Sequence, residues 1–189
     1  IENEYFASIQ DAIDAAQNND VIVVLEDVDL STNQFVTLDN SFNTYFKVEG
    51  KTVTIDLNGK TISGEYAIAS PWLVGVFSTE NDGHLTLEDN VGTAKVDITG
   101  VNGEVYALIA NYESGCSITI NGGTYILDDV YYGNGSAPGA LVWSSPSAND
   151  GEGIRVNGGN FHLGNVATGS NASPWIFNVN GNNSGHIKV

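Results

Sequence analysis

"SITINGGTYIL" at residues 117–127 returns as "GIRVNGGNFHL" at 153–163, and "GHIKV" at 185–189 begins the same pattern again. A segment that recurs along the chain predicts a structural unit that recurs in space. The apolar-x-apolar triplet inside each copy also occurs three times earlier. Its first residue lies at positions 22, 55, 85, 118, 154 and 187, so the steps are 33, 30, 33, 36 and 33 residues. Such an even period indicates a solenoid, in which loops absorb differences in length while the strands stay in register.

Each repeat contains three strand-like pieces. The triplet is the first, and an alternating piece at 60–64, 94–98, 124–127 or 160–163 follows a turn that contains Gly or Asn. A more apolar third piece lies at 72–77, 106–112, 140–143 or 175–179. Three strands per coil predict an all-β, right-handed parallel β-helix of about five coils of roughly 33 residues, stacked about 4.8 Å apart. The alternation predicts that these triplet and flanking residues point inward: Ile22, Val24, Ile55, Leu57, Leu85, Leu87, Ile118, Ile120, Ile154 and Val156.

The turns carry their own repeat. Asn-Gly follows the triplet at 58–59, 121–122 and 157–158, whereas the third copy has "EDN" at 88–90. Asn and Gly tolerate a positive φ, so one kind of turn is expected at this corner of successive coils. Stacked Asn side chains can hydrogen-bond from coil to coil, and we expect this ladder to be interrupted at 88–90.

The N-terminal segment has a different period. In "SIQDAIDAAQNND", Ile9, Ala12, Ile13 and Ala16 lie on one helical face, and Ser8 is a candidate N-cap. A short helix within 5–18 would cover the apolar, unpaired end of the stack. We therefore divide the chain into an N-terminal cap at 1–20 and β-helix coils at 21–189.

The last triplet, at 187–189, has no second or third strand after it. An uncovered coil exposes unpaired backbone groups and apolar interior. We therefore expect the coils to be truncated at the C-terminus, with the native polypeptide continuing past Val189. Further coils or a second copy of the chain are the expected cover for this end.

The composition excludes several classes of protein. With 6 Lys and Arg against 23 Asp and Glu, the formal net charge is −17, and no basic surface for nucleic acid can form. No apolar run reaches the roughly 18 residues of a membrane helix, so membrane insertion is not expected. A low Lys content with many Gly, Asn, Ser and Thr favours an extracellular location, secreted or at the cell surface. Cys116 is the only cysteine, which excludes an internal disulfide framework.

The cap "SIQDAIDAAQNNDVIVVL", followed by "VTIDLNGKTISG" and "ITINGGTY", resembles the pectin-lyase-like parallel β-helix superfamily. It is similar in particular to repetitive surface proteins of gut and soil bacteria whose coils contain "ITINGGTF"-type segments. The resemblance covers nearly the whole chain. Because its motifs are structural, it implies the fold more strongly than an activity.

Many members of that superfamily cleave acidic polysaccharides, and this activity is the alternative function. A lyase site of that kind needs Ca²⁺ on several carboxylates and a basic residue as proton acceptor. Arg155 could meet Lys188 on the next coil, but no carboxylate trio lies beside that pair, and the net charge would repel a polyanion. A hydrolase site needs paired Asp residues on adjacent coils, whereas Asp128 and Asp129 are neighbours on one extended strand. No catalytic residue is therefore assigned.

Aromatic residues are the candidate ligand-binding groups. "ASPWLVGVF" at 69–77 recurs as "ASPWIFNVN" at 172–180, which would place Trp72 and Trp175 at nearly one angular position, with Tyr106 and Trp143 close to it. A column of rings could stack on sugars, and the alternative is that these rings belong to the core.

The longest insertion, "DDVYYGNGSAPG" at 128–139, is the second candidate site. It adds Tyr131 and Tyr132 to the candidate ligand-binding residues, and Asp128 and Asp129 are its candidate Ca²⁺ ligands. The alternatives are a loop without a role and solvated carboxylates. No cofactor is required by this interpretation, although bound Ca²⁺ is compatible with it.

Together these features predict a non-catalytic, extracellular β-helix module of a larger bacterial surface protein. Its expected role is adhesion or display, with a carbohydrate or another cell-surface ligand as the partner.

Overall fold

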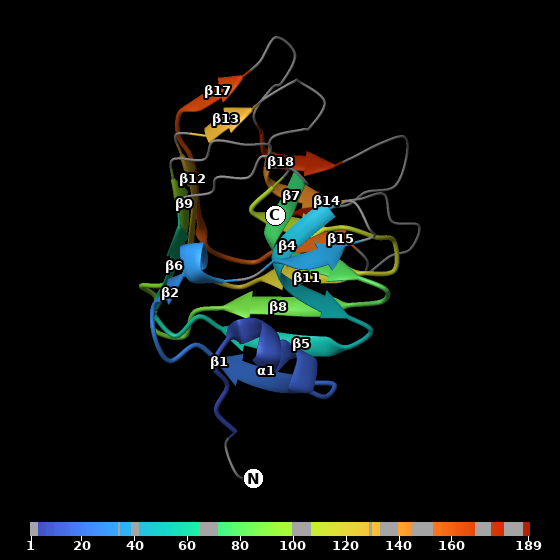
Figure 1. Cartoon of the computed structure of the whole chain (residues 1–189). Coiled ribbons are helices and arrows are strands. Elements are labelled where there is room, and N and C mark those ends of the chain that lie inside the picture. Colours follow the sequence, from blue (N-terminus) through green and yellow to red (C-terminus); the bar gives the residue numbers. More distant parts are fainter. Residues whose placement is uncertain are drawn as a thin grey trace.

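Three sheets, parallel except for one antiparallel strand pair, surround the core and form a parallel β-solenoid with one short helix (Figure 1). The computed structural model describes residues 4–33, 35–38, 42–64, 72–99, 107–128, 130–132, 140–144, 153–168, 175–179 and 187–189. No helix in these ranges is long and apolar enough to cross a membrane.

The first sheet contains one strand from each of the six predicted triplets, in chain order from one end of the solenoid to the other. Ile118 pairs with Leu85 on one side and with Ile154 on the other, so the repeat that defines the period is also the repeat that stacks. The strands of this sheet are β1 (Asp20–Val23), β5 (Thr52–Asp56), β8 (His84–Glu88), β11 (Ser117–Ile120), β15 (Gly153–Val156) and β19 (Ile187–Lys188).

The register of this sheet corrects the predicted alignment by two residues. Ile55 pairs with Leu87, whereas Leu85 pairs with Val53. The short step of 30 residues between positions 55 and 85 therefore comes from aligning non-equivalent residues. A shift of two leaves each side chain on the same face of its strand. The predicted burial consequently holds: Ile22 is half-buried against the core, and the other nine predicted residues are buried.

The second sheet confirms the predicted second strands. Its inward row runs Val28, Ile62, Val96, Tyr125 and Phe161. The strands are β2 (Val28–Asp29), β6 (Thr61–Gly64), β9 (Lys95–Thr99), β12 (Thr124–Asp128) and β16 (Asn160–Leu163).

The third sheet confirms the predicted third strands and adds two that the sequence did not indicate. The first coil reaches this sheet through the 3₁₀ turn η1 (Leu30–Thr32) and an antiparallel pair, β3 and β4. The strands are β3 (Val36–Leu38), β4 (Phe42–Glu49), β7 (Trp72–Glu80), β10 (Ile109–Asn111), β14 (Ala140–Ser144) and β18 (Trp175–Val179).

The number of complete coils corrects the prediction of about five. About three coils are complete, in the sense that each of their strands has a parallel neighbour on both sides: β5–β6–β7, β8–β9–β10 and β11–β12–β14. The outer coils contribute strands that lie at sheet edges, and β4 has the antiparallel β3 on its outer side. The sequence period is the same for inner and outer copies, so it cannot show which of them lack a neighbour.

The "NGG" segment recurs because its corner leaves no room for side chains. Gly123 and Gly159 have φ values of +90° and +112°, which favour glycine. A Cβ on Gly158 would lie 2.7 Å from the carbonyl oxygen of Asn121 in the coil before. Asn157 Nδ2 also donates to Asn121 Oδ1 at 2.9 Å. The Asn ladder therefore exists between these two coils.

The ladder is interrupted at 88–90, as predicted. Asp89 lies between two Asn-Gly turns, and its Oδ1 accepts a hydrogen bond from Gly59 N at 2.9 Å. Asn58 Nδ2 donates to the carbonyl of Val24 in the preceding coil at 2.9 Å. A carboxylate thus takes over the link between coils at this position.

The predicted N-terminal helix is α1 (Ile9–Ala15). Ser8 caps it by accepting from Asp11 N, and Ile9, Ala12 and Ile13 are its buried face. Lys51 Nζ donates to the carbonyl oxygens of residues 13, 14 and 16, at 3.0–3.1 Å, and so satisfies the C-terminal end of the helix. Figure 1 shows α1 at the end of the stack where the chain begins.

Candidate functional site

The predicted aromatic residues do not form one column. Phe77, Ile109, Val142 and Phe177 make up one row across the third sheet. Trp72 lies five residues before this row on β7, Trp175 lies two residues before it on β18, and Trp143 lies one residue after it on β14. The recurrence of "ASPW" in the sequence does not align the two tryptophans in the sheet, because the two strands reach the row after different numbers of residues. Tyr106 lies outside the described residues.

Trp143 is part of the packing of the third sheet. It is 5 % exposed and belongs to a buried cluster with Leu38, Ala107, Ala110 and Ala140. Its ring lies 6.2 Å from that of Tyr112. For this residue the alternative interpretation, a core aromatic, is the one that the structure supports.

Trp175 has the opposite environment. It is 52 % exposed and lies on β18, an edge strand of the third sheet. Its neighbour in register is Ala140, which is fully buried. The side chain of Trp175 is thus open to solvent, whereas that of Trp143 is not.

The insertion at 128–139 contains a strand that pairs with the next coil. Tyr131 and Tyr132 belong to β13 (Val130–Tyr132), which is parallel to β17 (Val166–Thr168). This two-stranded sheet is separate from the other three and stands apart from them in Figure 1. The sequence interpretation missed this pairing because neither strand is longer than three residues. Both strands follow directly after the second strand of their coil, and this shared position is the signal that could have revealed them.

Asp128 is engaged by the neighbouring coil. Its Oδ1 accepts a hydrogen bond from Asn165 N at 2.5 Å. Asp129, the other predicted Ca²⁺ ligand, lies outside the described residues. Within the described part of the chain, no group of three or more His, Cys, Asp or Glu is arranged to hold a metal ion.

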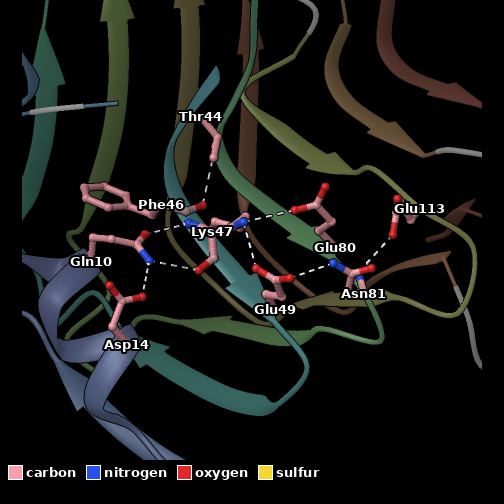
Figure 2. Close-up of polar contacts among 9 residues, drawn as sticks. All are labelled: Gln10, Asp14, Thr44, Phe46, Lys47, Glu49, Glu80, Asn81 and Glu113. Atoms are coloured by element: carbon pink, nitrogen blue, oxygen red, sulfur yellow. Dashed lines mark hydrogen bonds and ion pairs between the residues drawn. The ribbon is translucent and has the colours of Figure 1, made fainter. Parts of the chain in front are cut away.

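A charged network that the sequence did not reveal runs across neighbouring coils, from Lys47 and Glu49 on β4 to Glu80 on β7 and Glu113 after β10 (Figure 2). Lys47 Nζ contacts Glu49 Oε2 at 2.7 Å and Glu80 Oε2 at 3.1 Å. Asn81 donates from Nδ2 to Glu49 Oε1 at 2.6 Å and from its backbone N to Glu113 Oε2 at 3.0 Å. Positions 49, 80 and 113 recur at about one coil, so their spacing was the available signal.

The surroundings of Lys47 keep it charged. Its side chain is only 16 % exposed, and burial alone would lower its pKa. The hydrogen bonds and the attraction from Glu49 and Glu80 outweigh this effect and raise the pKa above its usual value. The pKa of Glu49 is lowered, first by its hydrogen bond with Lys47 and then by that with Asn81. A lysine held in this way donates hydrogen bonds and does not act as a proton acceptor near neutral pH.

Other carboxylates hold the turns together. Asp89 Oδ2 accepts from Ala94 N at 2.7 Å, while its Oδ1 accepts from Gly59 N. Burial raises the pKa of Asp89, but hydrogen bonds from backbone N–H groups outweigh it, and the net pKa is lowered. Asp27 Oδ1 likewise accepts from Thr61 N at 2.8 Å in the next coil. Such acidic side chains link neighbouring coils by accepting hydrogen bonds from backbone N–H groups.

Comparisons of this chain with protein-family models, with curated proteins and with solved structures find no match. The class of protein is therefore defined by the fold alone: a parallel β-solenoid repeat protein.

Proposed function

We propose that this chain is a non-catalytic, extracellular solenoid module of a larger bacterial surface protein, with a role in adhesion or display and in carbohydrate recognition. The observation that carries the proposal is the use of charged side chains as structural links. Lys47 is neutralised by two carboxylates, and Asp27, Asp89 and Asp128 bind backbone N–H groups of neighbouring coils or turns. Groups committed to such contacts support a scaffold better than they support proton transfer.

The proposed family is the pectin-lyase-like superfamily, with right-handed winding. Three parallel sheets behind a capping helix support this assignment. Right-handed crossovers between parallel strands are strongly preferred, because the twist of the strands favours them. The polysaccharide lyase or glycoside hydrolase of the same fold remains the alternative function.

We propose the β13–β17 sheet as the glycan site. These strands lie outside the three sheets that enclose the core, so their sequence is free to serve binding. Loops that project from a rigid scaffold are where recognition commonly resides. Tyr131 and Tyr132 supply two consecutive aromatic residues on β13. No cofactor is needed for this role.

The test is glycan binding by a double variant, Tyr131→Ala with Tyr132→Ala, on an array of pectin, alginate and mucin glycans, each with and without Ca²⁺. We expect binding to weaken by roughly tenfold or more, about 1.4 kcal/mol. Tyr5→Ala is the matched control, because Tyr5 is 79 % exposed and lies at the opposite end of the chain.

Three results would contradict the proposal. Equal binding by the double variant and the wild type would remove the site from β13. Loss of binding in Trp175→Ala alone would move it to β18. Release of sugar products by the wild-type protein would favour the enzyme, and a Ca²⁺ requirement would then point to the carboxylates at 128–129.

A further inference from the structure

The C-terminal edge of the third sheet is apolar and open among the described residues. Ala140–Ser144 on β14 are all at most 5 % exposed, because β18 covers them. On β18 itself Trp175 is 52 %, Ile176 41 % and Val179 38 % exposed. These residues are apolar like those of β14, but no further strand lies beside them among the described residues. An edge of this kind is a template for pairing with another strand.

The core of the solenoid is also incompletely covered at this C-terminal end. The ring of Tyr125 is buried and stacks on that of Phe161, with centroids 5.3 Å apart and planes 14° apart. Phe161 in turn contacts Phe177 at 5.2 Å. Both phenylalanines are only half-buried, and β16, like β18, is an edge strand. Core side chains are therefore exposed over the end of the stack as well as along its rim.

The charge of the chain changes sharply towards this end. All 23 Asp and Glu and four of the six Lys and Arg lie in residues 1–152, which gives that part a formal charge of −19. Residues 153–189 contain Arg155 and Lys188 and no acidic residue, so their formal charge is +2. Two copies of a chain with a net charge of −17 repel one another most where their carboxylates meet. The C-terminal coil is the part that can approach a copy of itself without that repulsion.

The N-terminal end has an apolar edge as well, but it lies in the first sheet: β1 is an edge strand there, and its Val21 and Val23 are 58 % and 44 % exposed. At Lys47 the backbone of β4 is already satisfied, since Gln10 Nε2 donates to Lys47 O at 3.2 Å and Gln10 Oε1 accepts from Lys47 N at 2.7 Å. The outward side of α1 presents the exposed Asp11 and Asp14. The apolar rim of the third sheet gains little by packing on these polar groups, and β1 belongs to a different sheet, so it is not in line with β18.

From these four observations we infer that two copies of this chain associate through their C-terminal coils, end to end. A two-fold axis through the third sheet brings β18 of one copy beside β18 of the other, running antiparallel. The third sheet then continues across the interface, and Phe161 and Phe177 are covered by the facing coil. The contact uses the same surface on both copies, so it closes at two and does not propagate.

The test is the mass of the 189-residue chain by analytical ultracentrifugation over a wide concentration range. We expect a reversible dimer. Ile176→Lys places a charge on the edge strand and should weaken the dimer by roughly tenfold or more. Val91→Lys is the control, because Val91 is 59 % exposed in the turn after β8 and outside this interface; its dimer should match that of the wild type.

Val179→Lys is a second edge variant, which keeps the test decisive if the far-ultraviolet circular dichroism of Ile176→Lys shows unfolding. A wild-type chain that stays monomeric at every concentration would overturn the inference. Assemblies that grow beyond two with concentration would also overturn it, since they require a head-to-tail contact. Equal weakening by Val91→Lys and the edge variants would show that added charge, and not the edge, is responsible.

Discussion

The two ends of the solenoid differ in what covers the core and the edge strands. At the N-terminal end, α1 covers the core with Ile9, Ala12 and Ile13, and Gln10 takes the place of a neighbouring strand for β4. At the C-terminal end, β16 and β18 remain edge strands, and Trp175 is 52 % exposed. The strands themselves are alike at both ends. Their stability and accessibility therefore depend on what lies against them.

The largest expected effect contrasts an inner coil with the open end. Ile118→Ala on β11, where the side chain is fully buried between two neighbouring strands, should lower the free energy of unfolding by about 2–5 kcal/mol. The same change at Ile176 on β18, 41 % exposed, should cost less than about 1 kcal/mol. Urea denaturation measures both. Equal losses would mean that β18 is as well covered as β11, and the contrast between inner coil and edge would fail.

The next effect concerns the cap. Gln10→Ala removes both hydrogen bonds to the backbone of Lys47, and the free energy of unfolding should fall by about 1–3 kcal/mol, because the freed groups lie on a partly buried strand. Hydrogen exchange should also become faster at the amide of Lys47. Gln17→Ala is the control, since Gln17 is exposed and uses its backbone N, not its side chain, to bind Asp20. If both variants lose the same stability, the cap acts only through its apolar face.

The smallest expected effect is the pH dependence of the stability that Glu49 contributes to the first coils. The pKa of Glu49 is lowered from 4.5, so its contribution to stability is present above that value and is lost as the pH falls through the lower folded value. Glu49→Gln should therefore cost less than about 1 kcal/mol near neutral pH, because the Glu49 side chain is 44 % exposed and its ion pair is screened. The difference from the wild type should vanish in acid.

Denaturation curves measured across the acid range test this prediction, with Glu26→Gln as the control for the loss of one exposed charge. A difference that persists unchanged in acid would show that the ion pair with Lys47 does not stabilise the first coils. Since residues 153–189 have no acidic side chain, hydrogen exchange in β15 and β16 should respond least to acid.

The sequence by itself determined the parallel solenoid, the second and third strands of the later coils, the capping helix and the faces that are buried. These features are local or periodic. Alternation decides which side of a strand faces the core, and a register error of two residues, as between Ile55 and Leu85, leaves that side unchanged. The repeat of "NGG" likewise predicted one kind of turn at 121–123 and 157–159, although the positive φ lies at the second Gly of each copy and not in the Asn-Gly pair.

Only the tertiary structure decided which residues meet across coils. The network of Lys47, Glu49, Glu80 and Glu113 depends on an exact register between strands whose loops differ in length, and so does the separation of Trp72, Trp143 and Trp175. The pairing of β13 with β17 joins two short insertions that have no period of their own. The difference between the ends, one capped and one open, is also tertiary, because a repeat carries the same pattern whether or not a neighbour covers it.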